Sequence, residues 1–447
     1  MKNFIKFLKT DIKIINSYFL FAIILIILIS IGYSSYALFS FTKTSNNVIV
    51  ATVGELKNNI DTSGANVPVL ASNMIPVYYD EISNVWKKAD IKNGKTNPWY
   101  SYESSGEYKG MWANAVTVKD TNRQTYLNAT PGTTIPMDDI TTMWVWIPRF
   151  NAVTPSNYNG GTQAKPNAID VTFVKQNETA IDAFTFGNKE LSGFWYGKFE
   201  ISHATLASST TENNLGCTNE TCSNANGIII KPNVTSLRYN NQSKFFFASR
   251  SMEQPNNSFG FVSSEVDTHM SKNNEWGAVA YLTQSIYGRC TSSTSCTEVG
   301  INNKSSYITG YGAPAGSNDS ATNGAYNTTL GKAASTTNNI YGIYDMSGGA
   351  YEFVMGVYSN KISSSGFSSL PDTKYYNNYT GSSYTGHALT ETKNWYSDDA
   401  DYVISIDPWF LRGGHFNRGT NAGVFNFIYN SGYLHARKSS RFVITNE

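Results

Sequence analysis

The chain has 447 residues, and 34 Lys and Arg against 33 Asp and Glu give a formal net charge of +1. This near balance excludes a strongly basic nucleic-acid-binding surface, so no nucleic-acid partner is expected. Charged residues make up 15% of the chain, below the roughly 25% of ordinary globular proteins, whereas aromatic residues reach 14%. Disorder goes with high charge and few aromatic residues, so the composition predicts one large or two ordinary folded domains.

The N-terminus carries an apolar segment that no charged residue interrupts. Residues 18–39 are long enough to span a bilayer as a signal-anchor helix. Lys outnumbers Asp before this segment, so the positive-inside rule predicts a cytoplasmic tail at residues 1–17 and an extracellular stalk at residues 40–72. A signal peptide cleaved near Ala37 is the alternative, and it would make the protein secreted rather than a single-pass protein of the cell membrane.

Aromatic density rises after the stalk, which predicts that the folded ectodomain starts there. We divide it into an N-terminal part, residues 73–189, and a second domain, residues 190–447. Residues 143–148, Met-Trp-Val-Trp-Ile-Pro, alternate in the period-2 manner of a strand, and Pro148 should end that strand because it cannot donate a ladder hydrogen bond. Residues 194–201 are predicted to form a second short strand.

One helix is predicted, over residues 271–287. Trp276, Val279 and Ile286 recur near helical spacing, and this pattern places Trp276 in the core. Gly288 is then expected to serve as the C-terminal cap. Long loops rich in Asn, Ser, Thr and Gly lie between the predicted elements; such loops need a rigid frame and usually carry recognition.

The four cysteines are grouped in two close pairs. Four residues separate Cys217 from Cys222, and five separate Cys290 from Cys296. Each pair predicts a disulfide bond that closes one loop, as expected of an extracytoplasmic domain. A zinc site is the alternative, but only the first pair has the usual ligand spacing, and no His lies close to it in the sequence.

Common catalytic motifs are missing from the sequence: there is no Walker loop, dinucleotide fingerprint, His-Glu-x-x-His or Gly-x-Ser-x-Gly. The five histidines show no metal-ligand spacing: His203, His269, His387, His415 and His435. Three carboxylates cluster at Asp398, Asp399 and Asp401. A solvated turn and a calcium site both fit this cluster, since calcium takes several oxygen ligands from one loop.

Two segments carry a family resemblance. Residues 338–354 read Asn-Asn-Ile-Tyr-Gly-Ile-Tyr-Asp-Met-Ser-Gly-Gly-Ala-Tyr-Glu-Phe-Val, and residues 410–416 read Phe-Leu-Arg-Gly-Gly-His-Phe. Together with residues 193–202 and 274–281, they resemble the formylglycine-generating-enzyme-like (sulfatase-modifying factor) family. The resemblance covers about residues 190–447 and implies an α+β fold of the C-type-lectin type, with few helices, short strands and long loops. The ectodomain also resembles anchored surface proteins of AT-rich gut bacteria.

Departures from the family pattern bear on activity. The oxidases of this family use two thiols near the C-terminus, whereas the last cysteine here is Cys296, which precedes the Asp345 motif. The resemblance therefore implies a non-catalytic branch, in which Asp345 and Glu352 are framework residues. Gly349 replaces an Asn that helps to bind calcium in some members, while Glu352 remains, so calcium at Glu352 stays open and no other cofactor is expected. The family's terminal Gly-Phe-Arg appears as residues 440–442, Ser-Arg-Phe.

The C-terminal run, residues 412–444, resembles the variable region of retroelement-diversified surface proteins of the C-type-lectin type. Small and aromatic residues form an apparent framework: Gly413, Gly414, Phe416, Gly419, Ala422, Gly423, Phe425, Phe427, Gly432 and Ala436. Chemically mixed residues lie between them: His415, Asn417, Arg418, Ile428, Tyr429, Asn430, Tyr433, Leu434, His435, Arg437 and Lys438.

Tyr, His, Arg and Asn displayed together suit ligand binding, because rigid aromatic rings supply contact area and polar groups supply adaptable hydrogen bonds. We expect Tyr429, Tyr433, His435 and Arg437 to contact a ligand. His415 and Arg418 are expected nearby. An ordinary protein surface is the alternative.

These observations predict a non-catalytic bacterial cell-surface protein that binds an extracellular protein or glycan. Two other hypotheses remain open. One is a structural subunit of the envelope or of an appendage. The other is a metal-dependent enzyme of the formylglycine-generating-enzyme-like family.

Overall fold

The computed structural model describes residues 59–207, 215–318 and 323–446. The predicted cytoplasmic tail, the signal-anchor segment and residues 40–58 lie outside this part of the chain. Within the described residues, no helix has both the length and the apolar character needed to cross a membrane. The described residues belong to one compact unit, which begins at Asn59.

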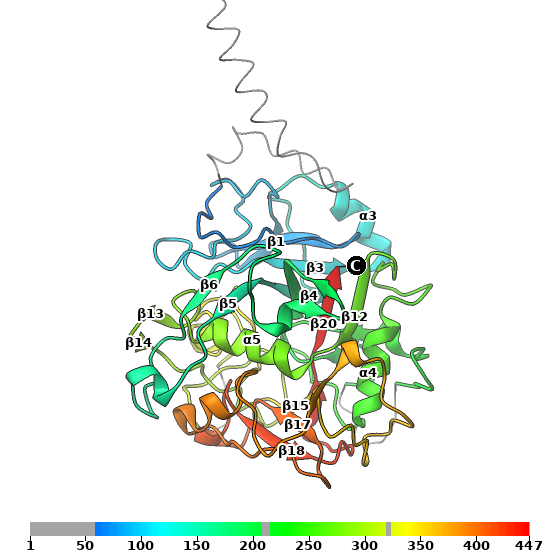
Figure 1. Cartoon of the computed structure of the whole chain (residues 1–447). Coiled ribbons are helices and arrows are strands. Elements are labelled where there is room, and N and C mark those ends of the chain that lie inside the picture. The colour runs from blue at the N-terminus through cyan, green and yellow to red at the C-terminus, as the bar shows by residue number, and fades with distance from the viewer. Residues whose placement is uncertain (1–58, 208–214, 319–322, 447) are drawn as a thin grey trace, which may run out of the picture. The chain divides into compact units, whose positions relative to one another are not determined.

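A seven-stranded antiparallel sheet forms the centre of this unit (Figure 1). Its strands, in spatial order, are β12 (Val266–Met270), β20 (Phe442–Asn446), β9 (Gly193–Gly197), β4 (Ile140–Pro148), β3 (Asn114–Val118), β1 (Ile75–Asp80) and β2 (Val85–Lys88). Trp144 and Trp146 of β4 are both buried, as are the aliphatic residues that alternate with them. Both faces of β4 are therefore covered, which explains why the strand is apolar throughout rather than only on alternate residues.

A second sheet has the order β16-β15-β17-β18, and one further strand pairs with β15. The strands are β15 (Tyr351–Tyr358), β16 (Asn377–Tyr379), β17 (Trp409–Arg412), β18 (Phe427–Asn430) and β19 (Lys438–Ser440). β15, β17 and β18 lie at the end of the unit away from β1 and β3 (Figure 1). The sheet is mixed, since β15 pairs in parallel with β16 and β19 but antiparallel with β17.

The remaining elements are short. Four two-stranded pairs join β5 (Phe150–Ala152) to β6 (Val171–Phe173), β7 (Thr185–Phe186) to β8 (Lys189–Glu190), β10 (Ser202–His203) to β11 (Ile228–Ile229), and β13 (Cys290–Ser292) to β14 (Ser295–Cys296). The α-helices are α3 (Asp120–Asn128), α4 (Gln242–Ser251), α5 (Asn273–Thr283) and α6 (Thr329–Ala333). The 3-10 helices are η1 (Asn157–Gly160), η2 (Asp182–Phe184), η3 (Ala225–Gly227), η4 (Thr373–Tyr375), η5 (Thr390–Thr392), η6 (Trp395–Ser397) and η7 (Gly419–Asn421).

The predicted fold class is confirmed in its coarse form: the described chain is mostly β-structure with few helices and long loops. The predicted helix is present as α5, and Trp276 is fully buried in it, but it is shorter than expected. It ends at Thr283 because the chain turns there: Arg289 N donates back to Thr283 O over 2.7 Å. Gly288 is therefore not the cap of the helix. Its lack of a side chain allows the turn to pack closely against the end of α5, since a Cβ at Gly288 would lie 2.4 Å from Thr283 O.

The strand predicted at residues 143–148 is confirmed as the greater part of β4, which ends at Pro148. The strand predicted at 194–201 is confirmed only as β9, which ends at Gly197. Beyond it, Glu200 N donates to the Asp345 carboxylate over 3.4 Å, so the backbone leaves the ladder for a side-chain partner. Sequence analysis missed the other α-helices, including α4, whose N-cap Asn241 accepts a hydrogen bond from Lys244 N.

The segments predicted as a stalk and as two separate domains contact one another in the structure. Residues 73–189 and 190–447 both contribute to the large sheet, because β4 pairs with β9. The described end of the predicted stalk lies against the same unit. Asn66 Nδ2 donates to Val174 O over 2.9 Å, and Trp195 Nε1 donates to Val69 O over 2.7 Å.

Both predicted disulfide bonds are confirmed. Cys217 pairs with Cys222 and Cys290 pairs with Cys296. The second bond closes the hairpin of β13 and β14. All four cysteines of the sequence are thereby used, so no thiolate is present for catalysis or for metal binding.

Arg441 lies where the chain passes from one sheet to the other, between β19 and β20. Its side chain is fully buried and forms an ion pair with Glu352 of β15, with Nε 3.0 Å from Oε2. The same guanidinium donates to Gly197 O of β9 over 2.8 Å and to Tyr344 O over 2.9 Å. One side chain thus joins both sheets and the segment that precedes β15.

We expect Arg441→Met to destabilise the protein strongly, because it leaves the Glu352 carboxylate buried without its partner. Loss of one member of a buried pair costs about 3–5 kcal/mol. The measurement is the free energy of unfolding in urea. Arg437→Met is the matched control on an exposed arginine, with an expected change within about 0.5 kcal/mol. Equal effects of the two substitutions would contradict the role given to Arg441.

Candidate functional site

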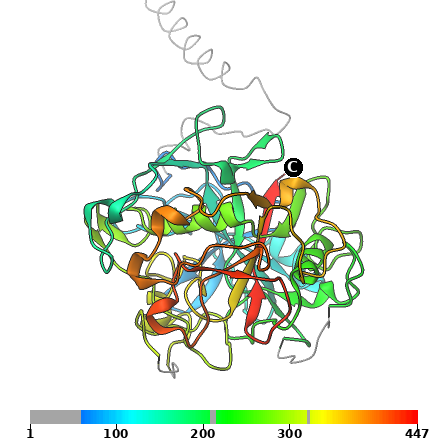
Figure 2. The same cartoon turned by 60° about the horizontal axis from the view of Figure 1, so that its bottom comes forward.

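Four of the predicted contact residues lie on one edge of the second sheet. Tyr429 belongs to the edge strand β18, and Tyr433, His435 and Arg437 belong to residues 431–437, which connect β18 to β19. Tyr429 is 43% exposed and Tyr433 is 56% exposed, and His435 and Arg437 are exposed as well. We call these four residues the C-terminal face. Figure 2 turns this end of the unit toward the viewer.

The backbone of residues 431–437 is held by hydrogen bonds from several parts of the chain. Four carbonyl oxygens accept hydrogen bonds from backbone N–H groups: Ser431 O from Ser364 N (3.0 Å), Gly432 O from Gln242 N (3.3 Å), His435 O from Tyr239 N (3.3 Å) and Arg437 O from Tyr351 N (2.8 Å). Two accept hydrogen bonds from side chains: Tyr433 O from Lys438 Nζ (2.8 Å) and Ala436 O from Arg238 Nη1. The loop is therefore ordered by the domain, while its exposed side chains stay free to contact a ligand.

Two residues of this region, Gly432 and Lys438, fix the conformation of the loop and are not part of its exposed surface. Gly432 has φ +84°, and a Cβ there would lie 2.6 Å from Ser365 Cα, so only glycine fits without strain. Lys438 is buried, and its ammonium group also donates to Asn430 Oδ1 over 2.9 Å. Burial lowers the pKa of Lys438 to about 8. These contacts fix the path between Asn430 and Lys438.

His415 lies beneath the C-terminal face and not on it. Only 3% of the residue is exposed, and its ring packs edge-on against Tyr351 with centroids 5.0 Å apart. Its Nε2 lies 3.4 Å from Arg437 Nη1, and its Nδ1 accepts a hydrogen bond from Asn417 N. Burial, reinforced by nearby Arg437, Arg418 and His435, lowers the pKa of His415 to about 4. The imidazole is therefore neutral near pH 7. In this state its two ring nitrogen atoms can contact Asn417 N and Arg437 Nη1 without burying a charge.

Arg418 is half-exposed at the margin of this region and forms an ion pair with Asp399. The division predicted between framework and mixed residues agrees with burial for most framework residues and for about half of the mixed ones. Eight framework residues are buried: Gly413, Gly414, Gly419, Ala422, Gly423, Phe425, Phe427 and Gly432. Five mixed residues are exposed: Asn417, Tyr429, Tyr433, His435 and Arg437. Leu434 and Lys438 are buried, as is His415, because they pack or bond beneath the loop.

The predicted framework acids lie deep in the unit. Asp345 Oδ1 accepts from Gly310 N and from Asn302 Nδ2, each over 2.8 Å. Glu352 is engaged by a guanidinium, which opposes a cation at the same oxygen atoms. At Gly349 a Cβ would lie 2.2 Å from Glu200 Oε1, so an Asn at this position requires the buried Glu200 carboxylate to move. Calcium at Glu352 gains no support from these contacts.

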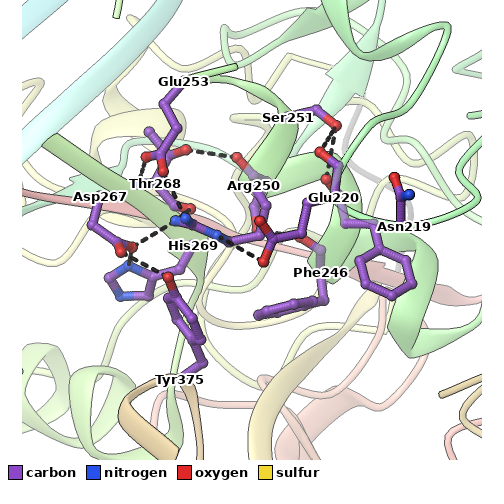
Figure 3. Close-up of polar contacts among 12 residues, drawn as sticks. Asn219, Glu220, Phe246, Arg250, Ser251, Glu253, Asp267, Thr268, His269 and Tyr375 are labelled. Carbon is purple, nitrogen blue, oxygen red and sulfur yellow. Dashed lines mark hydrogen bonds and ion pairs between the residues drawn. The ribbon is translucent and has the colours of Figure 1, made fainter. Parts of the chain in front are cut away.

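A second buried polar cluster connects α4, β12 and η4 (Figure 3). Through Glu275 it also includes α5. His269 Nδ1 lies 3.1 Å from Asp267 Oδ1, and Nε2 lies 3.0 Å from Glu275 Oε1. Asp267 also accepts from Arg250 Nη1 and from the Tyr375 hydroxyl, each over 2.8 Å. Burial opposes a charge on His269, but the two carboxylates outweigh it and raise the pKa of His269. Sequence analysis missed this cluster because the burial of its members and the contact with Tyr375 depend on the tertiary structure.

This cluster has the composition of a catalytic centre but not its accessibility. His269 and Glu275 are fully buried, and Asp267 is only 2% exposed, so a substrate cannot reach the imidazole in this conformation. Across residues 59–207, 215–318 and 323–446, no group of three or more His, Cys, Asp or Glu side chains is arranged to hold a metal ion. The cluster holds three successive elements, α4, β12 and α5, together and connects them to the more distant η4.

No protein-family model matches the chain, and no curated protein sequence matches it. Among solved structures, the chain is similar to Treponema denticola variable protein 1, with a TM-score of 0.32 and 11% identity over 69% of this chain and 97% of that one. It is also similar to the Major Tropism Determinant P3c Variant, with a TM-score of 0.29 and 12% identity over 85% of this chain and 73% of that one. Likenesses this weak assign neither a fold nor a function.

The pKa of His415 predicts a pH dependence of stability. The unfolded chain binds a proton at this residue near pH 6.5, whereas the folded protein does so only at about 4. The contribution of neutral His415 to the free energy of unfolding is therefore fully present above the pKa of the unfolded chain. It is lost progressively as the pH falls from there toward about 4. We expect the wild-type protein to lose about 1 kcal/mol more than His415→Asn between about pH 7 and about pH 5, measured by urea unfolding. The same pH dependence in both proteins would contradict this assignment.

Proposed function

We propose that this protein is a non-catalytic recognition protein that binds an extracellular protein or glycan through its C-terminal face. The observation that carries the proposal is a loop whose backbone is held by the domain while its aromatic and basic side chains are exposed. Ordering an interface loop normally costs binding free energy. Residues 431–437 are already ordered by their hydrogen bonds to the domain, so their ordering would not reduce the free energy of binding.

The chemistry of the face suits recognition. Tyr429 and Tyr433 offer large rings with few rotatable bonds, so contact area is gained at a low cost in side-chain entropy. Such rings stack on flat apolar surfaces, and their hydroxyl groups donate and accept hydrogen bonds. Arg437 adds several donors and can stack on an aromatic group of a ligand. These properties fit protein and glycan ligands alike.

The paired cysteines and the buried acids support a non-catalytic function. The family's oxidative chemistry needs free thiols, and all four cysteines here form disulfide bonds. Glu352 and Asp345 are committed to Arg441, Asn302 and backbone N–H groups. Their hydrogen bonds are those of framework residues.

We further propose that the recognition domain lies outside the cell and is anchored through residues 18–39. Two disulfide bonds fit an oxidising compartment. The apolar segment of the sequence would retain the protein at the membrane. Cleavage near Ala37 would release the same domain as a secreted protein.

The test is binding of the full-length chain to a combined array of glycans and surface proteins. A variant with Tyr429, Tyr433, His435 and Arg437 all replaced by Ala should lose at least about 30-fold in affinity, because such aromatic and Arg anchors carry most of the binding free energy of an interface. The control variant replaces Tyr384 and Lys393 by Ala, two exposed residues outside the C-terminal run. It should bind like the native chain.

Equal binding by the four-residue variant and the native chain would overturn the assignment of the face. Regular assembly of the purified chain without any array ligand would favour the structural-subunit hypothesis instead. Turnover that depends on a bound transition metal would favour the enzyme hypothesis. Circular dichroism of each variant separates lost binding from lost folding.

A further inference from the structure

The position of the proton on the His415 imidazole is set by Asn417. The backbone N–H of Asn417 donates to His415 Nδ1 over 3.3 Å. In a neutral imidazole one ring nitrogen accepts and the other carries the proton, and the hydrogen bond made by one nitrogen decides the state of the other. Because Nδ1 accepts, the proton of His415 lies on Nε2. His415 Nε2 is therefore a donor.

This donor faces a second donor. Arg437 Nη1 lies 3.4 Å from His415 Nε2, and a guanidinium has only N–H groups and no acceptor. Two donors cannot satisfy each other, so both N–H groups at this contact need an acceptor from elsewhere. His415 is only 3% exposed, which leaves little room for bulk water to supply that acceptor.

The guanidinium of Arg437 is also free of any carboxylate. Within the described chain Arg437 forms no ion pair, whereas Arg418 pairs with Asp399. The backbone of Arg437 is fixed all the same: its N–H donates to His435 Nδ1 over 3.1 Å, and its carbonyl oxygen accepts from Tyr351 N over 2.8 Å. An exposed and uncompensated positive charge is thus held at a defined position on the C-terminal face.

The surroundings of this pair of donors are basic. Burial is the main reason for the low pKa of His415, and the basic groups of Arg437, Arg418 and His435 lower it further. The carboxylate of Asp399 is already engaged by Arg418. A negatively charged ligand group at Arg437 would therefore enter a site with complementary charge.

We propose that the C-terminal face binds an acidic saccharide whose carboxylate lies between Arg437 and His415. The proposal rests on the recognition function given above and names the chemical group that is recognised. Charge-assisted hydrogen bonds are about 2.8 Å long. One carboxylate oxygen can therefore reach both donor nitrogen atoms, which lie 3.4 Å apart. The second oxygen remains for another N–H of the guanidinium fork.

The other residues of the face suit the remainder of a sugar. Tyr429 and Tyr433 are 43% and 56% exposed, and their rings offer flat surfaces on which a sugar ring can pack. His435 Nδ1 accepts from Arg437 N, so in its neutral form the proton lies on the exposed imidazole's Nε2, which can donate to a hydroxyl group. These groups surround the carboxylate position with contacts for neutral parts of the ligand.

The small number of exposed side chains favours a saccharide over a protein. Five mixed residues of the C-terminal run are exposed. A stable protein interface uses about 20–30 residues on each side. A short saccharide needs far fewer contacts, and a carboxylate held by Arg and His donors would supply much of its specificity. Binding to an acidic protein surface is the competing outcome of the test.

The experiment measures binding of the full-length chain to array glycans that carry uronic or sialic acid. Every glycan that binds is measured again after its carboxylate has been converted to the neutral amide. We expect at least one acidic glycan to bind, and its amide to bind about tenfold or more weakly, because hydrogen bonds to charged groups are the stronger ones. Added salt should weaken binding of the acid and change binding of the amide little.

Two variants test the assigned residues. Arg437→Gln should weaken binding of the acidic glycan by about tenfold and binding of its amide much less. His415→Phe keeps an aromatic ring against Tyr351 but removes the Nε2 donor, and it should weaken binding of the acid by about threefold or more. Lys393→Gln is the matched control, since it removes the same charge from an exposed position outside the C-terminal run. It should bind like the native chain.

The proposal fails if no acidic glycan binds, if acid and amide bind equally, or if Lys393→Gln loses as much affinity as Arg437→Gln. Arg437 is exposed, so its replacement decides the matter even if the Tm shows that His415→Phe does not fold. The recognition function is judged separately. If the native chain binds a protein or a neutral glycan through the four residues of the face, that function stands and the acidic saccharide is wrong; if it binds nothing on the array, both fail.

Discussion

The buried ion pair between Arg441 and Glu352 is the interaction on which the arrangement of the two sheets depends. The chain crosses from the second sheet to the large one within a single residue, and the side chain of that residue bonds to elements on both sides. A buried charge tolerates few alternative positions, because any displacement leaves it unsolvated and unpaired. The pair therefore sets where β19 ends and β20 begins, and with them the position of the loop that precedes β19.

That loop shows how a rigid frame and an exposed surface can be combined. Most of the carbonyl oxygens of residues 431–437 accept a hydrogen bond, and the donors come from segments around residues 238–242, 351 and 364. Those carbonyl groups are satisfied without the exposed side chains, so the side chains at Tyr433 and Arg437 can differ in chemistry without altering these bonds. His435 differs, because its Nδ1 accepts a hydrogen bond from Arg437 N over 3.1 Å. A surface of this kind can present many different side-chain sets on one fold.

Buried charges elsewhere in the unit are of two kinds. Those around His269 form a network in which both oxygen atoms of Asp267, Glu275 and Glu253 have a partner, and they connect α4, β12 and α5. Such a network stabilises a unique arrangement only when its members are satisfied. Asp398 belongs to the second kind, since one of its oxygen atoms has no donor among the described residues. This contrast separates a carboxylate that is only partly satisfied, at Asp398, from a network with a structural function at His269.

Local features of the sequence were sufficient to predict both disulfide bonds, the strand that ends at Pro148, the burial of Trp276 and the chemical character of the exposed C-terminal residues. These features depend on neighbours within a few positions, so spacing and periodicity report them. The surroundings of His415, the contact of Tyr375 with Asp267 and the enclosure of Asp398 could not be predicted, because they depend on residues far away in the sequence. Whether an ionisable side chain is exposed, paired or enclosed is decided by what packs against it, and only the tertiary structure determines that.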